Sequence, residues 1–323
     1  MNYAKAKHVA VETIPVVDIA PLIDGSDPKA VADRLHAASH ELGFIYITGH
    51  GIPDTVTEQA RATAFEFFRN ADENKAQVIV SDRHRGWLGP DGAKMADDAE
   101  PDLKESFIWG YEDADGRALD DHPLRGANRW PRFLPEMRDH AMAYFTRSHD
   151  VAYHLMRGFA LGLGLEEKFF IRSVARPLSR ASFVYYPAQP EDLGAARFGV
   201  GPHTDFGVLT VLCQDDVGGL QIENANGDWL HAPPIDGALV VNVGDLLARW
   251  TDGAYRSTPH RVVNTSGRER LSLVLAFDPE PETMIDPRDV FGADHQPKEP
   301  AITCGDYLIH RFARAFAYRG GTR

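Results

Sequence analysis

Cysteine is scarce in this chain. Cys213 and Cys304 are its only cysteines, and they lie far apart among the 323 residues. They offer no disulfide framework and no thiolate set of the kind that binds structural zinc, and this scarcity fits a reducing compartment. Because Cys213 lies in the apolar run 208–213, we expect a buried thiol there without a catalytic role.

Long apolar runs and basic runs are also missing. No stretch is long and apolar enough to cross a bilayer, and residues 1–10 lack the apolar segment of a signal peptide. The sequence therefore predicts a cytoplasmic protein without a membrane partner. The net charge of −13 repels polyanions, so we expect no nucleic acid partner either. A small-molecule substrate is the expected partner, and the sequence predicts no particular oligomeric state.

Turn-forming residues, by contrast, are plentiful. The chain has 28 glycines and 21 prolines, and 43% of its residues are hydrophobic, which indicates a globular fold with many turns. After Arg180, short apolar segments alternate with turn residues and predict a sandwich or barrel-like β core. We expect one domain over residues 1–323, with a mainly helical region containing short strands at 1–179, the β core with the metal site at 180–285 and a helical segment at 286–323.

Helical signals lie on both sides of the expected β core. Residues 28–43 follow a polar cap, and the apolar residues of 135–163 and 304–318 recur at helical spacing. The glycine- and proline-rich stretch 81–123 instead predicts an irregular lid or pocket wall. Its candidate substrate contacts, for which a solvated loop is an equally good interpretation, are Trp87, Lys94, Met95, Lys104 and Phe107. No ligand-like setting surrounds three other histidines, His50, His84 and His231.

The most informative motif pairs His203 with Asp205. Because one residue separates them, both side chains would project from the same face of a strand. Alone the motif is weak, but a Gly-Pro turn precedes it, apolar strands follow it, and His260 lies ahead of an alternating strand that begins at Arg270. Two imidazole nitrogens and one carboxylate oxygen suit Fe(II) and leave the opposite side of the metal open. The set predicts a redox-active iron site.

Nearly the whole chain resembles the isopenicillin N synthase-like branch of the iron(II)/2-oxoglutarate-dependent oxygenases. The resemblance is carried by residues 14–18, 43–53, 185–187, 203–220 and 242–245, and by His260 with the Arg270-Leu271-Ser272 motif. It implies an α+β fold in which a double-stranded β-helix (jelly-roll) core is flanked by N-terminal helices and a C-terminal helix. These motifs are specific to the superfamily and weakly informative about the substrate.

The resemblance also implies roles for individual residues. The implied iron ligands are His203, Asp205 and His260. Arg270 and Ser272 would bind the distal carboxylate of 2-oxoglutarate, and Tyr186 would also reach it. A planar guanidinium can donate two parallel hydrogen bonds to a carboxylate, and Ser272 would share its strand face. The alternative interpretation of Tyr186 is a core aromatic, and that of Arg270 is a surface ion pair, which the apolar alternation of residues 271, 273 and 275 on the opposite face disfavours.

The implied activity uses Fe(II), 2-oxoglutarate and O₂ to oxidise, and by default hydroxylate, an unactivated C–H bond of a small molecule, with release of succinate and CO₂. One departure is Val184, which stands where many relatives carry an asparagine beside the cosubstrate. Asp245 is expected to support a turn rather than take part in catalysis. Three alternatives stay open: an oxidase of the same fold that uses no 2-oxoglutarate, a non-catalytic barrel that binds a metal or anion, and a zinc hydrolase with the same ligands.

Overall fold

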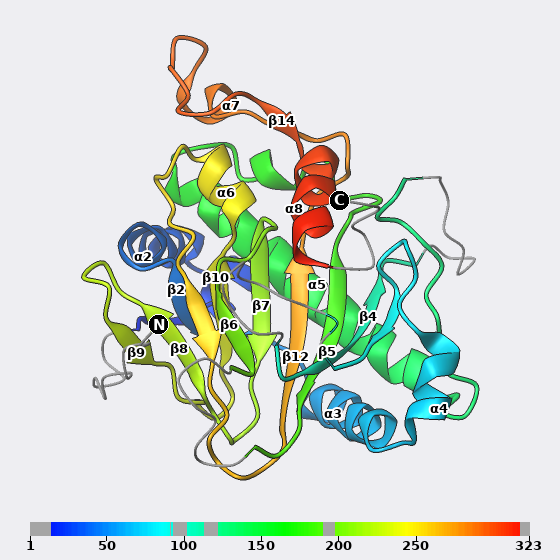
Figure 1. Ribbon diagram of the computed structural model, residues 1–323. Coiled ribbons are helices and arrows are strands. Elements are labelled where there is room, and N and C mark those ends of the chain that lie inside the picture. The colour runs from blue at the N-terminus through cyan, green and yellow to red at the C-terminus, as the bar shows by residue number, and fades with distance from the viewer. Residues whose placement is uncertain (1–13, 91, 93–101, 113–121, 190–197, 317–323) are drawn as a thin grey trace.

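The computed structural model describes residues 14–90, 92, 102–112, 122–189 and 198–316, and its centre is a pair of β-sheets (Figure 1). The larger sheet has eight strands, in the order β1 (Val16–Asp18), β2 (Phe44–Thr48), β10 (Leu239–Val243), β7 (Leu209–Cys213), β12 (Arg270–Phe277), β5 (Arg180–Tyr186), β4 (Glu105–Gly110) and β3 (Gly86–Leu88). The smaller sheet has four, in the order β6 (Val200–His203), β11 (His260–Val262), β8 (Leu220–Glu223) and β9 (Trp229–His231).

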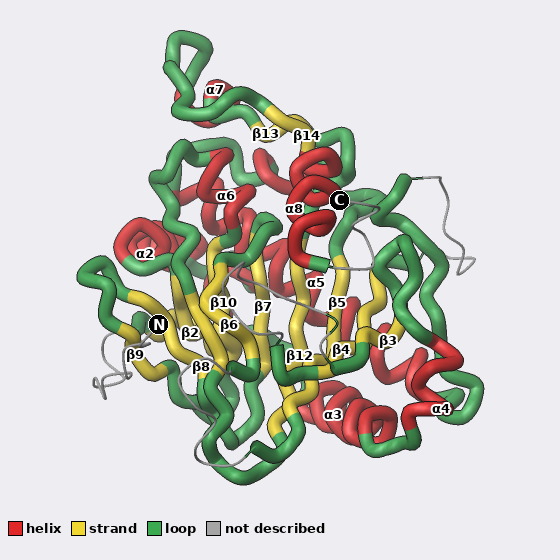
Figure 2. The backbone as a smooth tube through the Cα atoms, viewed as in Figure 1, coloured by secondary structure: helices red, strands yellow, loops and turns green. Residues whose placement is uncertain are grey.

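Helices surround the strands, which occupy the centre of the molecule in Figure 2. The helices are α1 (Ala20–Ile23), α2 (Pro28–Glu41), α3 (Asp54–Phe68), α4 (Asp72–Lys75), α5 (Met137–Gly162), α6 (Asp245–Trp250), α7 (Arg288–Phe291) and α8 (Cys304–Ala315). Two 3₁₀ turns, η2 (Ala76–Val78) and η3 (Phe169–Ile171), and a small ribbon of β13 (Met284–Ile285) with β14 (Ile302–Thr303) complete the described elements. Among the described helices, none combines the length and apolar composition needed to span a bilayer.

The predicted helices are confirmed. Helix α2 begins where the Asp27 side chain accepts a hydrogen bond from the Ala30 amide, and Pro28 occupies its first turn, where a missing amide hydrogen costs nothing. Helix α5 runs behind the large sheet in Figure 1 and buries the apolar stripe that predicted it. Helix α8 is capped by the Thr303 side chain, which accepts from the Asp306 amide.

Strand β12 separates two cores and thereby places polar groups inside the β structure. Leu271, Leu273 and Leu275 are fully buried in the outer core, which includes helix α5. Full burial of each leucine contributes about 1.5–3 kcal/mol, which fixes the face that the strand turns outward. Because side chains alternate along a strand, Arg270 and Ser272 point to the inner face, between the two sheets.

The prediction that residues 81–123 form an irregular lid or pocket wall is partly wrong. Strands β3 and β4 lie within it and form the edge of the large sheet, where β4 pairs with β5. Phe107 and Trp109 alternate with smaller residues along β4 and are fully buried, so their periodicity of two outweighs the turn residues around them. Lys94 and Met95 lie outside the described residues.

Candidate active site

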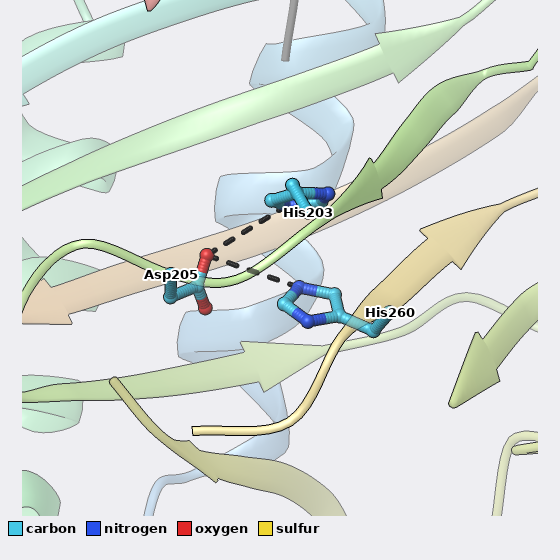
Figure 3. A group of neighbouring side chains, drawn as sticks. All are labelled: His203, Asp205 and His260. Atoms are coloured by element: carbon cyan, nitrogen blue, oxygen red, sulfur yellow. Dashed lines mark ion pairs between the residues drawn. The ribbon is translucent and has the colours of Figure 1, made fainter. Parts of the chain in front are cut away.

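Three side chains converge where the small sheet meets the loop that follows β6 (Figure 3). His203 ends β6 and His260 begins β11, and the antiparallel pairing of these strands makes the two histidines direct cross-strand partners. Asp205 lies two residues beyond the end of β6, and its Oδ1 is 3.8 Å from Nε2 of each histidine. The expectation that His203 and Asp205 share one strand is therefore wrong, although the convergence that it predicted is present.

Hydrogen bonds fix how each of these side chains presents its ligand atom. Nδ1 of His203 lies 2.8 Å from the Gly201 carbonyl oxygen, and Nδ1 of His260 lies 3.2 Å from the Thr258 carbonyl oxygen. A carbonyl only accepts, so each Nδ1 carries the proton and each Nε2 keeps its lone pair for a metal. Asn242 donates to Asp205 Oδ2 over 2.7 Å, which holds the carboxylate with Oδ1 turned toward the histidines.

The charge state of the cluster also suits a divalent metal. Burial, followed by the neighbouring His260 imidazole, lowers the pKa of His203 to about 3. Burial acts to raise the pKa of Asp205, but the two imidazoles and the hydrogen bond from Asn242 outweigh it and lower that pKa to about 2. At neutral pH His203 is therefore neutral and Asp205 is ionised, which are the forms in which these groups coordinate metals.

A second polar cluster surrounds Arg270 at the start of β12. Arg270 is fully buried, its Nη1 donates to Ser272 Oγ over 2.7 Å, and its Nε donates to the Gly218 carbonyl oxygen. Its guanidinium carbon lies 4.7 Å from the centre of the Tyr186 ring, the residue opposite it on β5. Nη2 is buried and has no hydrogen-bond partner in the described part of the chain. A buried guanidinium that has hydrogen bonds only to uncharged groups, and one nitrogen free, suits an anionic ligand.

Comparison with known proteins identifies the family. Residues 178–279 match the family model described as the 2OG-Fe(II) oxygenase superfamily, and residues 14–132 match the one described as non-haem dioxygenase in morphine synthesis N-terminal. The 2-oxoglutarate-Fe(II) type oxidoreductase ppzC of Metarhizium majus is 33% identical over 94% of this chain and 87% of its own length. The chain belongs to the 2OG-Fe(II) oxygenase superfamily.

Two further similarities extend over the whole fold. Homoarginine-6-hydroxylase 2-ODD-C23 of Glycine max is 33% identical over 86% of this chain and 88% of its own length. The crystal structure of a full-length Neurospora crassa protein in complex with alpha-KG matches with a TM-score of 0.83 at 29% identity, covering 93% of this chain and 96% of that one. The predicted fold class, with its double-stranded β-helix core, is confirmed.

This oxygenase is therefore a non-haem oxidoreductase that uses Fe(II) with 2-oxoglutarate as cosubstrate, and His203, Asp205 and His260 form its two-histidine, one-carboxylate triad. The donor set fits that metal, since neutral imidazole nitrogen and carboxylate oxygen with open positions are the ligands of non-haem Fe(II) oxygenases. The alternatives of a non-catalytic barrel and a zinc hydrolase are not supported.

Asp245 of the oxygenase connects the triad loop to helix α8. Its backbone amide donates to the Asp205 carbonyl oxygen over 2.7 Å, and its carboxylate accepts from Ser257 over 2.7 Å and from Thr204 over 3.2 Å. Arg311 of α8 forms an ion pair with the same carboxylate at 2.6 Å. These contacts support the expectation that Asp245 orders a turn and does not itself react.

A cavity of about 140 Å³ opens beside His203 and Asp205. Lys104 lines it, as proposed from the sequence, and so does Val184, which stands opposite Ser272 in the strand register. Phe107 and Trp87 do not line it, because Phe107 is a core residue and the Trp87 indole donates to Glu105. The proposal of these two as substrate contacts is wrong.

Sequence reasoning missed three residues of this region. His84 has no ligand-like setting in the sequence, yet its side chain lines the cavity, and its ring centre lies 4.6 Å from that of Phe312. Arg180 lines the same cavity from the start of β5. Asn242 carried the clearest signal, because a polar residue inside the apolar strand Leu239–Val243 is a buried group that needs a partner.

Proposed function

We propose that this oxygenase hydroxylates an unactivated C–H bond of a small molecule bound in the cavity beside His203 and Asp205. The observation that carries the proposal is the position of the triad, which converges at the wall of a cavity instead of inside a closed shell of side chains. Related proteins support it: one relative is a homoarginine-6-hydroxylase, and the similar Neurospora crassa protein has a structure with alpha-KG and thymine bound.

We also propose that Arg270, Ser272 and Tyr186 hold the distal carboxylate of 2-oxoglutarate. Arg270 supplies the charge and the unpartnered Nη2, and Ser272 holds the guanidinium in place through Nη1. Tyr186 closes the site by stacking beneath the guanidinium. A buried guanidinium whose Nη2 keeps both of its N–H donors free can bind a carboxylate with little reorganisation, because the protein has already removed the water around it.

When bound, Fe(II) with 2-oxoglutarate supplies the O₂-dependent oxidising chemistry. The residues of the chain position the metal ligands and the substrate. Asn242 and the two carbonyl oxygens hold the ligand atoms of the triad in fixed orientations, so that little rearrangement accompanies metal binding. Val184, Phe206 and Val274 give the cavity an apolar lining, which excludes water from the substrate C–H bond and holds it near the triad.

The test of the cosubstrate site compares two arginines that are close in sequence. Anaerobic titration of the Fe(II) protein with 2-oxoglutarate is expected to produce a metal-to-ligand charge-transfer band, and Arg270→Gln is expected to weaken the binding. Arg268→Gln is the matched control, because Arg268 is exposed and pairs with Asp216 at the surface. Equal titrations of the two variants would contradict the assignment. Substrate-dependent succinate release then tests turnover.

Two broader expectations are proposals as well. We propose that residues 1–323 act as one oxygenase domain. One sheet supports this, because it contains the N-terminal strands β1, β2, β3 and β4 together with β5, β7, β10 and β12 of the β core. We further propose a cytoplasmic location, which the two buried, free cysteines support because a reducing compartment would leave them unpaired.

A further inference from the structure

Apart from the triad, the charged side chains among the described lining residues of the cavity are positive. Arg180 and Lys104 reach the cavity wall, and Asp205 is the acidic residue among the described lining residues. The partners of the two cations lie behind them: Asp278 is fully buried, and the side chain of Asp102 is 1% exposed. The cavity therefore presents N–H donors of the cations, while the carboxylates that balance their charge are not among its described lining residues.

Arg180 is held in a fixed orientation with donors to spare. Its Nη1 donates to Asp278 Oδ2 over 2.6 Å, and the other oxygen of that carboxylate accepts from the Val208 amide over 3.0 Å. The guanidinium carbon lies 4.7 Å from the centre of the Phe312 ring on α8. Among the described residues, the Arg180 guanidinium donates a hydrogen bond through Nη1. Its Nε and Nη2 have no hydrogen-bond partner there and remain for a ligand.

The two cations lie at opposite ends of strand β5. Arg180 is six residues from Tyr186, which corresponds to about 20 Å along an extended strand. Lys104 directly precedes β4, whose first residue pairs with Tyr185, so it lies at the end of β5 where Tyr186 pairs with Arg270. Arg180 is therefore too far from Arg270 to bind the same 2-oxoglutarate carboxylate. It lies beside the triad loop, because its partner Asp278 accepts from the Val208 amide, three residues after Asp205, and Arg180 and Asp205 line the same cavity.

We propose that the substrate is a small carboxylic acid with an apolar body, and that its carboxylate binds Arg180. This proposal rests on the function proposed above. A guanidinium edge with two remaining donors matches a carboxylate, and Phe312, Phe206 and Ile108 provide apolar surface for the rest of the molecule. A cavity of about 140 Å³ has room for one benzene ring, so a body consisting of a single ring or a short chain fits beside the triad.

The same geometry disfavours a cationic substrate head group. An ammonium or guanidinium group would meet Arg180 at one end, and the described lining offers it no carboxylate except the triad aspartate. The Arg180–Asp278 pair is neutral overall, so selection depends on directed hydrogen bonds at short range. A ligand without an acceptor oxygen would leave the free N–H groups of Arg180 without hydrogen bonds, and that loss disfavours its binding.

The experiment uses anaerobic Fe(II) protein saturated with 2-oxoglutarate and measures ligand binding by calorimetry. The probes are two matched sets, phenylacetate, phenylacetamide and phenethylamine, and butyrate, butyramide and butylamine. At least one acid is expected to bind about 10- to 100-fold more tightly than its amide and its amine, the range expected for hydrogen bonds between charged groups. The proposal is overturned if neither acid binds, or if an amide or amine binds as tightly as its acid.

The variants separate the role of Arg180 from a general loss of structure. Arg180→Gln/Asp278→Asn removes both charges of the buried pair and keeps side chains of similar shape, so no unpaired charge remains inside. It is expected to lose the preference for the acid. Arg172→Gln/Glu166→Gln is the control, because Arg172 pairs with Glu166 at the surface and stacks 5.3 Å over Phe169. An acid preference that survives in the Arg180 variant contradicts the proposal.

Failure of this proposal can be told from failure of the proposed function. The charge-transfer band of the wild-type protein reports whether Fe(II) and 2-oxoglutarate bind together, before any probe is added. If that band is absent, the proposed cosubstrate site is wrong. If the band forms and the acids show no preference, the site stands and only the assignment of Arg180 to a substrate carboxylate is overturned.

Discussion

The substitution Arg270→Met tests the cosubstrate site through protein stability. Arg270 is fully buried, its hydrogen bonds go to the uncharged groups of Gly218 and Ser272, and its Nη2 has no hydrogen-bond partner among the described residues. Two charge-assisted hydrogen bonds to 2-oxoglutarate would contribute about 3–6 kcal/mol, so their loss weakens binding by about 10²- to 10⁴-fold. Methionine fills a similar volume without charge but also loses the hydrogen bonds to Gly218 and Ser272, so each protein is compared with itself, with and without 2-oxoglutarate.

The size of the stability effect follows from mass action. At a 2-oxoglutarate concentration of about 100 times its Kd, binding raises the free energy of unfolding of the Fe(II) protein by about 2.7 kcal/mol. At that same concentration, a variant with at least 100-fold weaker binding gains no more than about 0.4 kcal/mol. Arg270→Lys is expected to fall between these values, because lysine keeps the charge but cannot present a planar pair of donors.

The assay is anaerobic urea unfolding of the Fe(II) protein with and without 2-oxoglutarate, followed by intrinsic fluorescence. Arg268→Met is the control, because Arg268 is exposed and lies two residues before Arg270. We expect the control to keep the full gain in unfolding free energy. A 2-oxoglutarate-dependent gain in Arg270→Met equal to that of the wild-type protein would refute the assignment, since the cosubstrate would then be held by other groups.

Three other predictions concern groups around the site and the core. Asn242→Leu removes the hydrogen bond to Asp205 and is expected to weaken Fe(II) binding by about 10- to 100-fold in equilibrium dialysis, while an unchanged affinity would contradict that role. Asp245→Asn removes the ion pair with Arg311 and is expected to cost about 1–3 kcal/mol of unfolding free energy in urea and to speed proteolysis of α8; an unchanged urea midpoint would argue against it. Burial lowers the pKa of His149 to about 4, so the unfolded chain binds more protons between pH 6.5 and pH 4 and stability falls as the pH falls through this window, by up to about 3 kcal/mol. His149→Phe is expected to flatten that acid slope, which urea unfolding at several pH values measures, and an identical slope would exclude His149 as its source.

The local pattern of the sequence was sufficient for elements whose periodicity is set by one buried face. The alternation of Leu271, Leu273 and Leu275 with Arg270 and Ser272 predicted both the strand and the side of it that holds the polar groups. Strand β4 escaped prediction because turn residues surround it, although its aromatic side chains alternate. Its burial depends on pairing with β5, which is distant in sequence.

The geometry of the site depends on register between distant strands, which local patterns do not encode. His203 and His260 meet because β6 and β11 pair at those positions, whereas the sequence grouped them by ligand type and motif order without giving that pairing. The position of Arg180 was even less predictable from local sequence patterns. Its orientation requires Asp278 and Phe312, which lie far along the chain, so neither its spacing nor its neighbours in sequence could indicate a place in the cavity.

The central claim is that His203, Asp205 and His260 together bind one Fe(II), to which 2-oxoglutarate then adds. Anaerobic equilibrium dialysis with Fe(II), followed by spectroscopic titration with 2-oxoglutarate, tests it most directly in the wild-type protein and in two histidine variants. We predict one tightly bound Fe(II) and a charge-transfer band in the wild-type protein and in His231→Ala, and neither in His260→Ala. Tight iron binding with the same band in His260→Ala would contradict the claim.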